Sequence, residues 1–264
     1  MASLDNKVVW ITGASSGIGE GIVKNLASQN VKLILSSRRA EVLEKVKAAC
    51  PNPDNIRILT IDLAQPDTLE AKTKEALSFF GRVDIVIHSG GISQRAFAMD
   101  TDIEVHRRLM EVNYFSTIII TKALLPSMIE NGFGYIVAIS SLVGKFGSPY
   151  RSGYSASKHA LHGYYDSLRA EIWKQGIHVT IATPGFIKTN VSVNALTEHG
   201  EKLNSMDQGQ ENGMSAEECG RQIIRAIVKE KEEVRIGGKE TFGILIKRFL
   251  PGVFSRMIRK MNVR

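Results

Sequence analysis

Cysteine is scarce in this sequence, and long apolar runs are missing from it. Only Cys50 and Cys219 occur among 264 residues, far apart and without a CxxC pair, so the pattern predicts neither a disulfide framework nor a zinc site. No apolar run reaches the ~18 residues expected of a membrane-spanning helix. The opening stretch, MASLDNKVVWITG, lacks the basic head, apolar core and cleavage site of a secretory signal. We therefore expect a cytoplasmic protein without a bound metal.

Acidic residues are missing from the C-terminal segment. Residues 244–264 hold six cations and no acid, so they carry +6 of the net charge of +7 and the other 243 residues carry +1. These cations alternate with aromatic and aliphatic residues, which is an amphipathic pattern. Such a segment can pack against the core or a neighbouring subunit, or can lie weakly on an anionic membrane surface. No aromatic platform or recognition motif accompanies them, which argues against nucleic acid as a partner.

Short β-branched runs alternate with longer segments of helical period. This alternation predicts an α/β fold, a single Rossmann-type doubly wound parallel sheet of about seven strands with helices on both faces. The strands are apolar on both faces, as buried parallel strands should be. Strands are expected at 7–12, 31–36, 56–61, 83–88, 134–140, 177–183 and 233–236, and helices near 17–29, 39–49, 66–80, 101–130, 153–175 and 215–230.

The chain divides into one domain and a tail. Residues 1–243 fit a single domain of ordinary size, and residues 244–264 form a basic amphipathic tail. Within the domain, residues 190–214 are polar, contain glycine and are weakly patterned. We interpret this segment as a lid over a substrate, or else as a plain surface loop.

A glycine-rich loop joins the first strand to the first helix. In TGASSGIG, the glycines let the turn tighten and let the backbone approach a pyrophosphate, which the helix N-terminus then favours. The strand before the loop, the helix after it and the repeating βα pattern strengthen this interpretation. The loop residues predicted to bind the cofactor are Gly13, Ser15, Ser16, Gly17, Ile18 and Gly19.

The end of the second strand favours NADP(H) over NAD(H). An acid there would bind the adenosine ribose hydroxyls and repel a 2′-phosphate, but the sequence has Ser37, Arg38 and Arg39. Arg38 is the expected main contact, with the other two assisting, and Arg39 is equally well explained as a surface residue of the next helix. Asp62 follows the third strand and is placed to accept from the adenine amino group, with Leu63 lending its backbone; helix capping is the alternative for Asp62.

Tyr154 and Lys158 in GYSASK are four residues apart, so a helix would place them on one face. A cation beside a phenol lowers the phenol's pKa, and the pair therefore suits acid/base chemistry on a carbonyl or an alcohol. Two such residues also occur together by chance in many solvated helices.

Five motifs occur in the order and spacing of the classical short-chain dehydrogenases/reductases, which this chain resembles over essentially its whole length. They are TGASSGIG at 12–19, Asn113 in EVNYFS, Ser140 and Ser141 in ISSLVG, YSASK at 154–158 and PGFIKT at 184–189. The tail is similar to that of the dehydrogenase/reductase member 7B-like branch.

The resemblance implies a catalytic set of Asn113, Ser141, Tyr154 and Lys158. Tyr154 would exchange a proton with the substrate oxygen, and Ser141 would hydrogen-bond the same oxygen. Lys158 would lower the pKa of Tyr154 and hold the nicotinamide ribose, so both also contact the cofactor. Asn113 would hold a water that links Lys158 to solvent.

The resemblance also adds cofactor contacts at the later strands. Thr189 and the backbone of Ile187 would hold the nicotinamide carboxamide, with Pro184 and Gly185 beneath it, although Thr189 also suits a helix cap. After the fourth strand the sequence departs from the usual NNAG. It has His88 followed by Ser89, Gly90 and Gly91, whose backbone can still pass close to the adenosine ribose.

Two other polar residues are not expected to act as the catalytic acid, base or nucleophile. A buried, hydrogen-bonded role is predicted for His88, and Ser140 lacks the family's spacing to Tyr154.

The residues and the resemblance together predict an NADP-dependent oxidoreductase that interconverts a carbonyl and a secondary alcohol. The alternative is a catalytically silent nucleotide-binding regulator with the same fold. Substrates that fit include a 3-oxoacyl thioester, a steroid-like ketone and a small hydroxy compound, in a pocket formed by residues 141–151, 92–95 and 190–214. Arg95 and Arg151 hint at an acidic substrate, but two surface arginines are the commoner explanation. A homodimer or homotetramer is implied by the resemblance.

Overall fold

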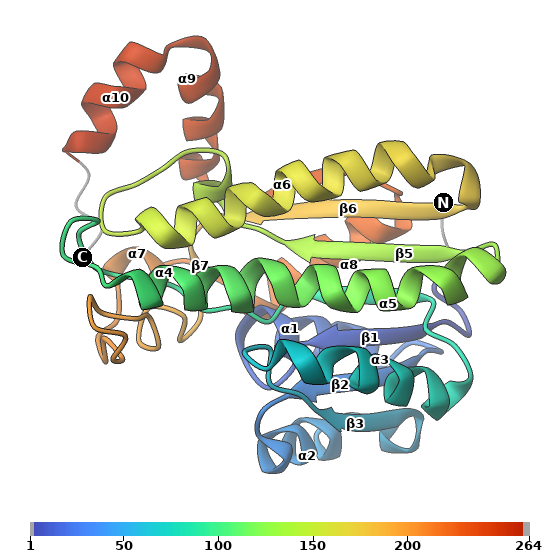
Figure 1. Cartoon of the computed structure of the whole chain (residues 1–264). Coiled ribbons are helices and arrows are strands. Elements are labelled where there is room, and N and C mark those ends of the chain that lie inside the picture. Colours follow the sequence, from blue (N-terminus) through green and yellow to red (C-terminus); the bar gives the residue numbers. More distant parts are fainter. Residues whose placement is uncertain (1–2, 261–264) are drawn as a thin grey trace.

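The computed structural model describes residues 3–260, and its centre is a parallel sheet of seven strands (Figure 1). The strand order is β3-β2-β1-β4-β5-β6-β9, and each neighbouring pair runs parallel. This confirms the predicted doubly wound α/β fold. The strands are β1 Val8–Thr12, β2 Lys32–Ser37, β3 Ile56–Thr60, β4 Ile85–His88, β5 Gly134–Ile139, β6 Ile177–Pro184 and β9 Glu233–Ile236; β7 Ile187–Lys188 and β8 Met214–Ser215 pair separately.

Helices cover both faces of the sheet. One apolar cluster packs α1, α2 and α8 on one face, and a second packs α3, α5 and α6 on the other. The helices are α1 Gly17–Leu26, α2 Ala40–Ala48, α3 Pro66–Phe80, α4 Ile103–Met110, α5 Ser116–Glu130, α6 Ser152–Ile172, α7 Gln208–Glu211, α8 Ala216–Val228, α9 Gly243–Phe249 and α10 Pro251–Arg259.

The central strands are apolar on both faces because both faces are covered. In β1, Val9 and Ile11 pack into the cluster with α1, while Val8 and Trp10 pack into the cluster with α5. All four are at most 2% exposed, and full burial of side chains of this size contributes about 1.5–3 kcal/mol each. The indole of Trp10 donates to Ser36 Oγ at 2.8 Å, which satisfies its one polar group.

The predicted single helix near 101–130 is confirmed as one continuous rod, Ile103–Glu130 (Figure 1). Its centre is not α-helical, because a π-helical turn, Glu111–Phe115, joins α4 to α5. Contrary to the expectation from apolar runs, the continuous helix Ile103–Glu130 is long and apolar enough to span a membrane by length and composition alone. The reason is that α5 presses Ile120, Leu124 and Met128 into the core, and a core helix passes the same test.

The segment at 190–214 packs against the body of the domain. Leu196 forms bridges with Gln94 and with Lys202, and the segment ends with the short helix α7 before β8.

The C-terminal helices α9 and α10 form a hairpin that projects from one end of the molecule (Figure 1). Phe254 of α10 is 6% exposed, and its ring centre lies 4.9 Å from that of Phe146. Of the predicted basic tail, residues 261–264 lie outside the described part of the chain. The described part of the tail packs on the domain through one face. Packing against the core was one of the alternatives predicted for the tail.

Candidate active site

A cavity of about 1120 Å³ lies at the carboxyl ends of the strands, where open parallel sheets place their ligands. All but one of the predicted cofactor contacts line this cavity. The exception is Gly19, which lies beneath the glycine loop. The others are Gly13, Ser15, Ser16, Gly17, Ile18, Ser37, Arg38, Arg39, Asp62, Leu63, Ser89, Gly90, Gly91, Tyr154, Lys158, Pro184, Gly185, Ile187 and Thr189.

The glycine loop has a backbone that only glycine adopts without strain. Gly13 and Gly17 have φ angles of +68° and +56°. A Cβ on Gly13 would stand 2.7 Å from the backbone of Gly90, so the first and fourth strands could not keep their close approach with a larger residue. Ser16 is the N-cap of α1, yet its side chain makes no capping hydrogen bond. Its hydroxyl and the first amides of α1 remain available to an anion, so the loop fits a pyrophosphate.

The segment after β2 brings cations to the far end of the cavity. Arg38 and Arg39 are both exposed, and Arg39 is the N-cap of α2. Ser37 Oγ accepts a hydrogen bond from the Arg39 amide at 3.3 Å. Asp62 Oδ1 accepts from the Ala64 amide at 3.0 Å, so this carboxylate shapes its own turn while it lines the cavity.

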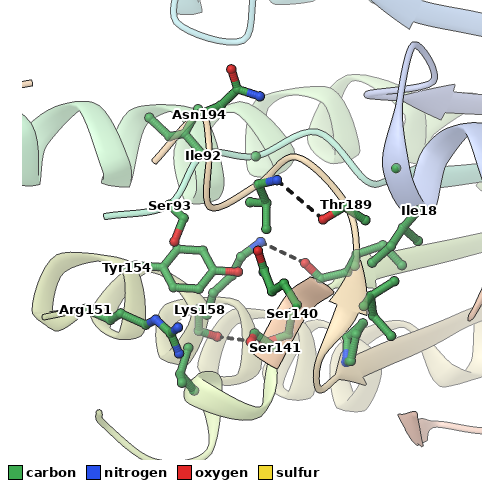
Figure 2. A pocket seen from close by; sticks show the side chains of 18 of the residues that line it. Ile18, Ile92, Ser93, Ser140, Ser141, Arg151, Tyr154, Lys158, Thr189 and Asn194 are labelled. Atoms are coloured by element: carbon green, nitrogen blue, oxygen red, sulfur yellow. Dashed lines mark hydrogen bonds between the residues drawn. The ribbon is translucent and has the colours of Figure 1, made fainter. Parts of the chain in front are cut away.

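Tyr154, Lys158 and Ser141 meet in the same cavity, as Figure 2 shows. The first two lie one turn apart on α6, and Ser141 follows β5 at the start of a 3₁₀ turn. Burial raises the pKa of Tyr154, and the hydrogen bond with Ser141 and the charges of Arg95 and Arg151 only partly offset that rise. A raised pKa keeps the phenol protonated at neutral pH, which suits a proton donor.

Lys158 differs from its expected role in one respect. Its Nζ donates to the Ile139 carbonyl at 2.8 Å and lies 5.8 Å from the centre of the Tyr154 ring. Burial lowers the pKa of Lys158 to about 8, so the ammonium is itself destabilised. The charges that lower the Tyr154 pKa in this structure come from Arg95 and Arg151, whereas the sequence assigned that effect to Lys158.

Asn113 lies behind the cavity wall in the π-helical turn. Its side chain is fully buried: Nδ2 donates to the Ile92 carbonyl and to Ser157 Oγ, both at 2.9 Å, and Oδ1 accepts from the Ile92 amide at 2.8 Å. The widened turn therefore ties the segment after β4 to α6, and Asn113 does not line the cavity.

Two polar residues have the structural roles expected of them. His88 is buried, its Nε2 lies 2.9 Å from Thr121 Oγ1, and burial lowers its pKa to about 3, so it is neutral. Ser140 Oγ donates to the Lys158 carbonyl at 3.2 Å and lies 3.0 Å from His162 Nε2. His88 is not among the residues that line the cavity, and Ser140, which lines it, donates its hydroxyl proton to the Lys158 carbonyl.

Arg95 and Arg151 are not surface residues, contrary to the expectation from sequence. Their side chains are 2% and 9% exposed, and both contact Asp207, at 2.5 and 3.0 Å between the guanidinium Nη2 and Oδ2. Asp207 was not singled out from the sequence, because it stands in the weakly patterned segment and its partners are 112 and 56 residues away.

An apolar wall closes another side of the cavity, and only its part from residues 141–151 was predicted from the sequence. It combines the turn after β5 with the C-terminal hairpin, and Leu142, Val143, Phe146, Ile244 and Phe254 form one buried cluster with Tyr154 at its edge. The amphipathic pattern of the tail was the available signal. Phe146, Ile246, Phe254, Met257 and Ile258 line the cavity from this side.

The geometry unites a nucleotide-binding loop with a serine, a tyrosine and a lysine at one end of a parallel sheet. The family model for short chain dehydrogenases matches residues 7–200 of the sequence. The chain belongs to the short-chain dehydrogenases. Members of this family are oxidoreductases that use NAD(P), so this short-chain dehydrogenase is an enzyme of that class.

One relative and two solved structures extend this assignment. Dehydrogenase/reductase SDR family member 7B of Mus musculus is 40% identical over 263 residues, 97% of this chain and 81% of the mouse protein. A short-chain dehydrogenase from Streptomyces avermitilis has a TM-score of 0.82 at 27% identity and covers 97% of this chain and 96% of its own. A short chain dehydrogenase from Burkholderia cenocepacia in complex with NADP has a TM-score of 0.81 at 22% identity, covering 98% and 100%. The last likeness concerns the fold alone.

Proposed function

We propose that this short-chain dehydrogenase interconverts a carbonyl and a secondary alcohol with NADP(H), and that Tyr154 is its acid/base. The observation that carries the proposal is the meeting of Ser141, Tyr154 and Lys158 in the cavity that the glycine loop also lines. The nicotinamide supplies the hydride, and the chain's own residues bind, orient and exchange the proton.

Each residue has a role that follows from its surroundings. The Tyr154 phenol, protonated because burial raises its pKa, donates to the carbonyl oxygen in reduction. Ser141 donates a second hydrogen bond to that oxygen. Lys158 has a pKa lowered by burial to about 8, so it can return a proton to Tyr154 near neutral pH. The side chain of Asn113, bonded to Ile92 and Ser157, holds the segment after β4 against α6; its role in a water relay is implied by the family resemblance. Thr189 and the Ile187 backbone orient the carboxamide.

Replacing Tyr154 with phenylalanine tests this mechanism. Because the ring and its packing stay while the hydroxyl is lost, Tyr154→Phe should keep NADPH binding within about threefold and reduce kcat by roughly 10²–10⁴, the range typical of general acid catalysis. NADPH fluorescence titration and initial rates on a ketone panel measure the two effects. Unchanged turnover in Tyr154→Phe refutes the mechanism.

The rival function is a nucleotide-binding regulator without turnover. Tight NADPH binding by the wild-type protein, together with no reaction on ketones or alcohols in either direction, is the result that would favour it. A pure nucleotide binder has little use for a protonated phenol that is paired with a serine hydroxyl and lies beside a lysine of lowered pKa, which is why the enzyme is the better account.

The preference for NADP(H) rests on the charge at the end of β2. Arg38 is exposed and lines the cavity beside Ser37, and an arginine binds a phosphate through a planar fork of donors. The NADP in the Burkholderia cenocepacia structure agrees with this choice. Arg38→Ala should weaken NADPH binding by at least tenfold and leave NADH binding within about twofold, as measured by fluorescence titration.

The distant surface residue Arg107, replaced by alanine, provides the matched control and should leave both affinities unchanged. Equal loss of NADPH and NADH affinity in Arg38→Ala would contradict the assignment of Arg38 to the 2′-phosphate.

The shape of the substrate follows from the apolar wall. Phe146, Phe254 and Ile246 flank the space in front of Tyr154, which suits a carbonyl compound with an apolar body such as a 3-oxoacyl thioester or a steroid-like ketone. A small hydroxy compound would leave this wall without a partner.

We also assign to this protein a cytoplasmic location, a homodimer or homotetramer, and weak contact with membrane surfaces. The homo-oligomer rests on the exposure of Phe115, at the end of the π-helical turn, and of Trp173, after α6, which are 47% and 67% exposed. Sedimentation equilibrium measures the oligomeric state directly. The proposed membrane contact rests on the hairpin α9–α10, where the side chains of Phe249, Leu250 and Met257 are more than half exposed and lie among cations.

A further inference from the structure

Three ionisable side chains from distant segments meet beside Tyr154. Arg95 follows β4, Arg151 is the N-cap of α6, and Asp207 precedes α7. The two arginines contact the one carboxylate, and all three residues are at most 7% exposed. The cluster therefore carries two positive charges and one negative charge away from water. A buried charge without a partner is costly, so the surplus cation calls for an explanation.

Four of the five N–H groups of Arg95 donate hydrogen bonds within the described chain. Its Nε donates to Asp207 Oδ2 at 3.0 Å and its Nη2 to the same oxygen at 2.5 Å, while Nη1 donates to Ser93 Oγ and to the Gln94 carbonyl, both at 2.7 Å. Such a largely satisfied guanidinium acts as a fixed charge that holds Asp207 in place.

Arg151 is different. Its Nη2 donates to Asp207, but its buried Nε has no hydrogen-bond partner within residues 3–260. Burial and the neighbouring charge of Arg95 lower the pKa of Arg151 to about 10, which shows how poorly the one carboxylate compensates it. Buried donors without partners are rare in native proteins, and Arg151 lines the cavity.

A second donor without a partner belongs to a residue that lines the same cavity. Ser148 lines the cavity, and its buried Oγ also has no hydrogen-bond partner in the described chain. Figure 2 shows Arg151 on the side of the pocket where Tyr154 and Ser141 face each other, and the charge of Arg151 acts on Tyr154 directly. An unsatisfied guanidinium and an unsatisfied hydroxyl thus border the space that a substrate would fill.

We propose that Arg151, held by Asp207 and backed by the charge of Arg95, forms a subsite that binds an oxyanion of the substrate, a carboxylate or a phosphate, while the substrate's carbonyl faces Tyr154. An oxyanion in the cavity that Arg151 lines neutralises the surplus charge of the cluster and offers acceptors to its guanidinium. Guanidinium groups match both oxyanions in shape and charge. The proposal rests on the proposed carbonyl–alcohol activity for its turnover test, but its binding test does not.

The turnover test compares anionic ketones with their neutral esters. Levulinate and 5-oxohexanoate are paired with their methyl esters, and 2-oxobutylphosphonate with its dimethyl ester, each with NADPH. Wild-type kcat/KM should favour the anion of at least one pair by tenfold or more, and the pair that responds distinguishes carboxylate from phosphate. Equal or better use of the ester in every pair overturns the proposal.

Variants assign the preference to Arg151. Arg151→Met removes the charge but leaves Asp207 paired with Arg95, so no lone carboxylate is buried and the fold should persist. It should lose at least tenfold in kcat/KM on the preferred anion and keep its rate on the ester within about twofold, while Arg151→Lys keeps part of the preference. Arg108→Met, an exposed cation at the rim of the same cavity, is the matched control and should retain the preference. An equal loss on anion and ester in Arg151→Met means a general effect on Tyr154 and overturns the subsite.

The binding test needs no turnover. Calorimetric titration of the protein saturated with NADP⁺ uses inorganic phosphate and levulinate as probes, with the neutral methyl levulinate as a blank. At least one anion should bind the wild type ten times more tightly than it binds Arg151→Met, even if every ketone proves inert. Equal affinity of both proteins for both anions refutes the subsite whatever the outcome for the proposed enzyme activity.

Discussion

Lys158 shows how a single residue can reduce stability in favour of function. Its ammonium is buried against a neutral carbonyl, and a pKa lowered from 10.5 to about 8 corresponds to a cost of about 3 kcal/mol for keeping it charged. A lowered lysine pKa means that the unfolded chain binds more protons, so the penalty is complete below pH 8, shrinks between pH 8 and 10.5 and vanishes above that range.

Lys158→Met should therefore stabilise the free protein while abolishing turnover. After the lost hydrogen bond to Ile139 is subtracted, the gain at pH 7 should be about 1–2 kcal/mol, or roughly 4 °C in Tm for a chain of this size. Thermal unfolding of the variant and the wild type at pH 7 and pH 10 measures it, with the exposed Lys45→Met as control. A gain that is as large at pH 10 as at pH 7 would contradict the titration of Lys158 as its cause.

Sequence reasoning works best at this scale where chemistry is concentrated in short motifs. Ser141, Tyr154 and Lys158 were predicted and do share one cavity. What the sequence could not reveal is the balance of forces on them: burial raises the Tyr154 pKa, and the arginines that oppose it come from other segments. Charge pairing across 112 residues, as between Arg95 and Asp207, leaves no local pattern to read.

At the scale of elements, the contact between α1 and α8 depends on the absence of side chains. A Cβ on Gly21 would lie 2.2 Å from the Ala216 carbonyl oxygen, and Gly220 meets the backbone of Gly21 in return. These neighbours are backbone atoms, so a larger residue can be accommodated only if a helix moves.

Two glycine-to-alanine variants separate this packing effect from helix propensity. Gly21→Ala should destabilise the protein by about 1–3 kcal/mol through overpacking. Gly163→Ala lies within α6 with no atom within 4 Å of the new Cβ, and it should stabilise by about 0.5–1 kcal/mol because alanine is the better helix former. Urea unfolding measures both changes. A stabilised Gly21→Ala would show that the helix contact is looser than described.

The ends of helices and strands could be predicted where the hydrophobic period and the position of a glycine indicated the same boundary, as for β1 and the start of α1 at Gly17. The π-helical turn could not be predicted, because EVNYF has the same apolar period as the helical sequence on either side. The interactions that hold the turn are the hydrogen bonds of Asn113 to the segment after β4, and these are tertiary contacts. The segment at 190–214 has weak local preference, and its place is fixed by contacts such as Leu196 with Gln94.

For the whole molecule, the uneven charge matters more than its total. The hairpin α9–α10 collects Lys247, Arg248, Arg256, Arg259 and Lys260 beside exposed apolar side chains. Anionic lipids attract such a surface by about 1 kcal/mol per cation, and salt screens the attraction.

The protein should therefore sediment with vesicles that contain anionic phosphatidylserine at about 20 mM salt, and be released at about 500 mM salt. Pure phosphatidylcholine vesicles and the double variant Arg256→Glu/Arg259→Glu should show little binding, because the charge term is absent or reversed. Cosedimentation measures all three. Indifference of the intact protein to the anionic vesicles at low salt would end the membrane proposal.

The π-helical turn between α4 and α5 also sets an angle. Val105 packs with Leu196 and Ile92, whereas Met128 packs into the core cluster of the sheet, so the two ends of the rod present different faces. On a regular α-helix, 23 residues at ~100° each would place the two side chains about 140° apart. Each residue of the wider i→i+5 turn advances less, so Glu111–Phe115 changes this angle. The turn thus acts as a phase correction in the longest rod of the molecule: it lets α4 face the substrate side and α5 face the sheet, with Asn113 at the one position that serves both.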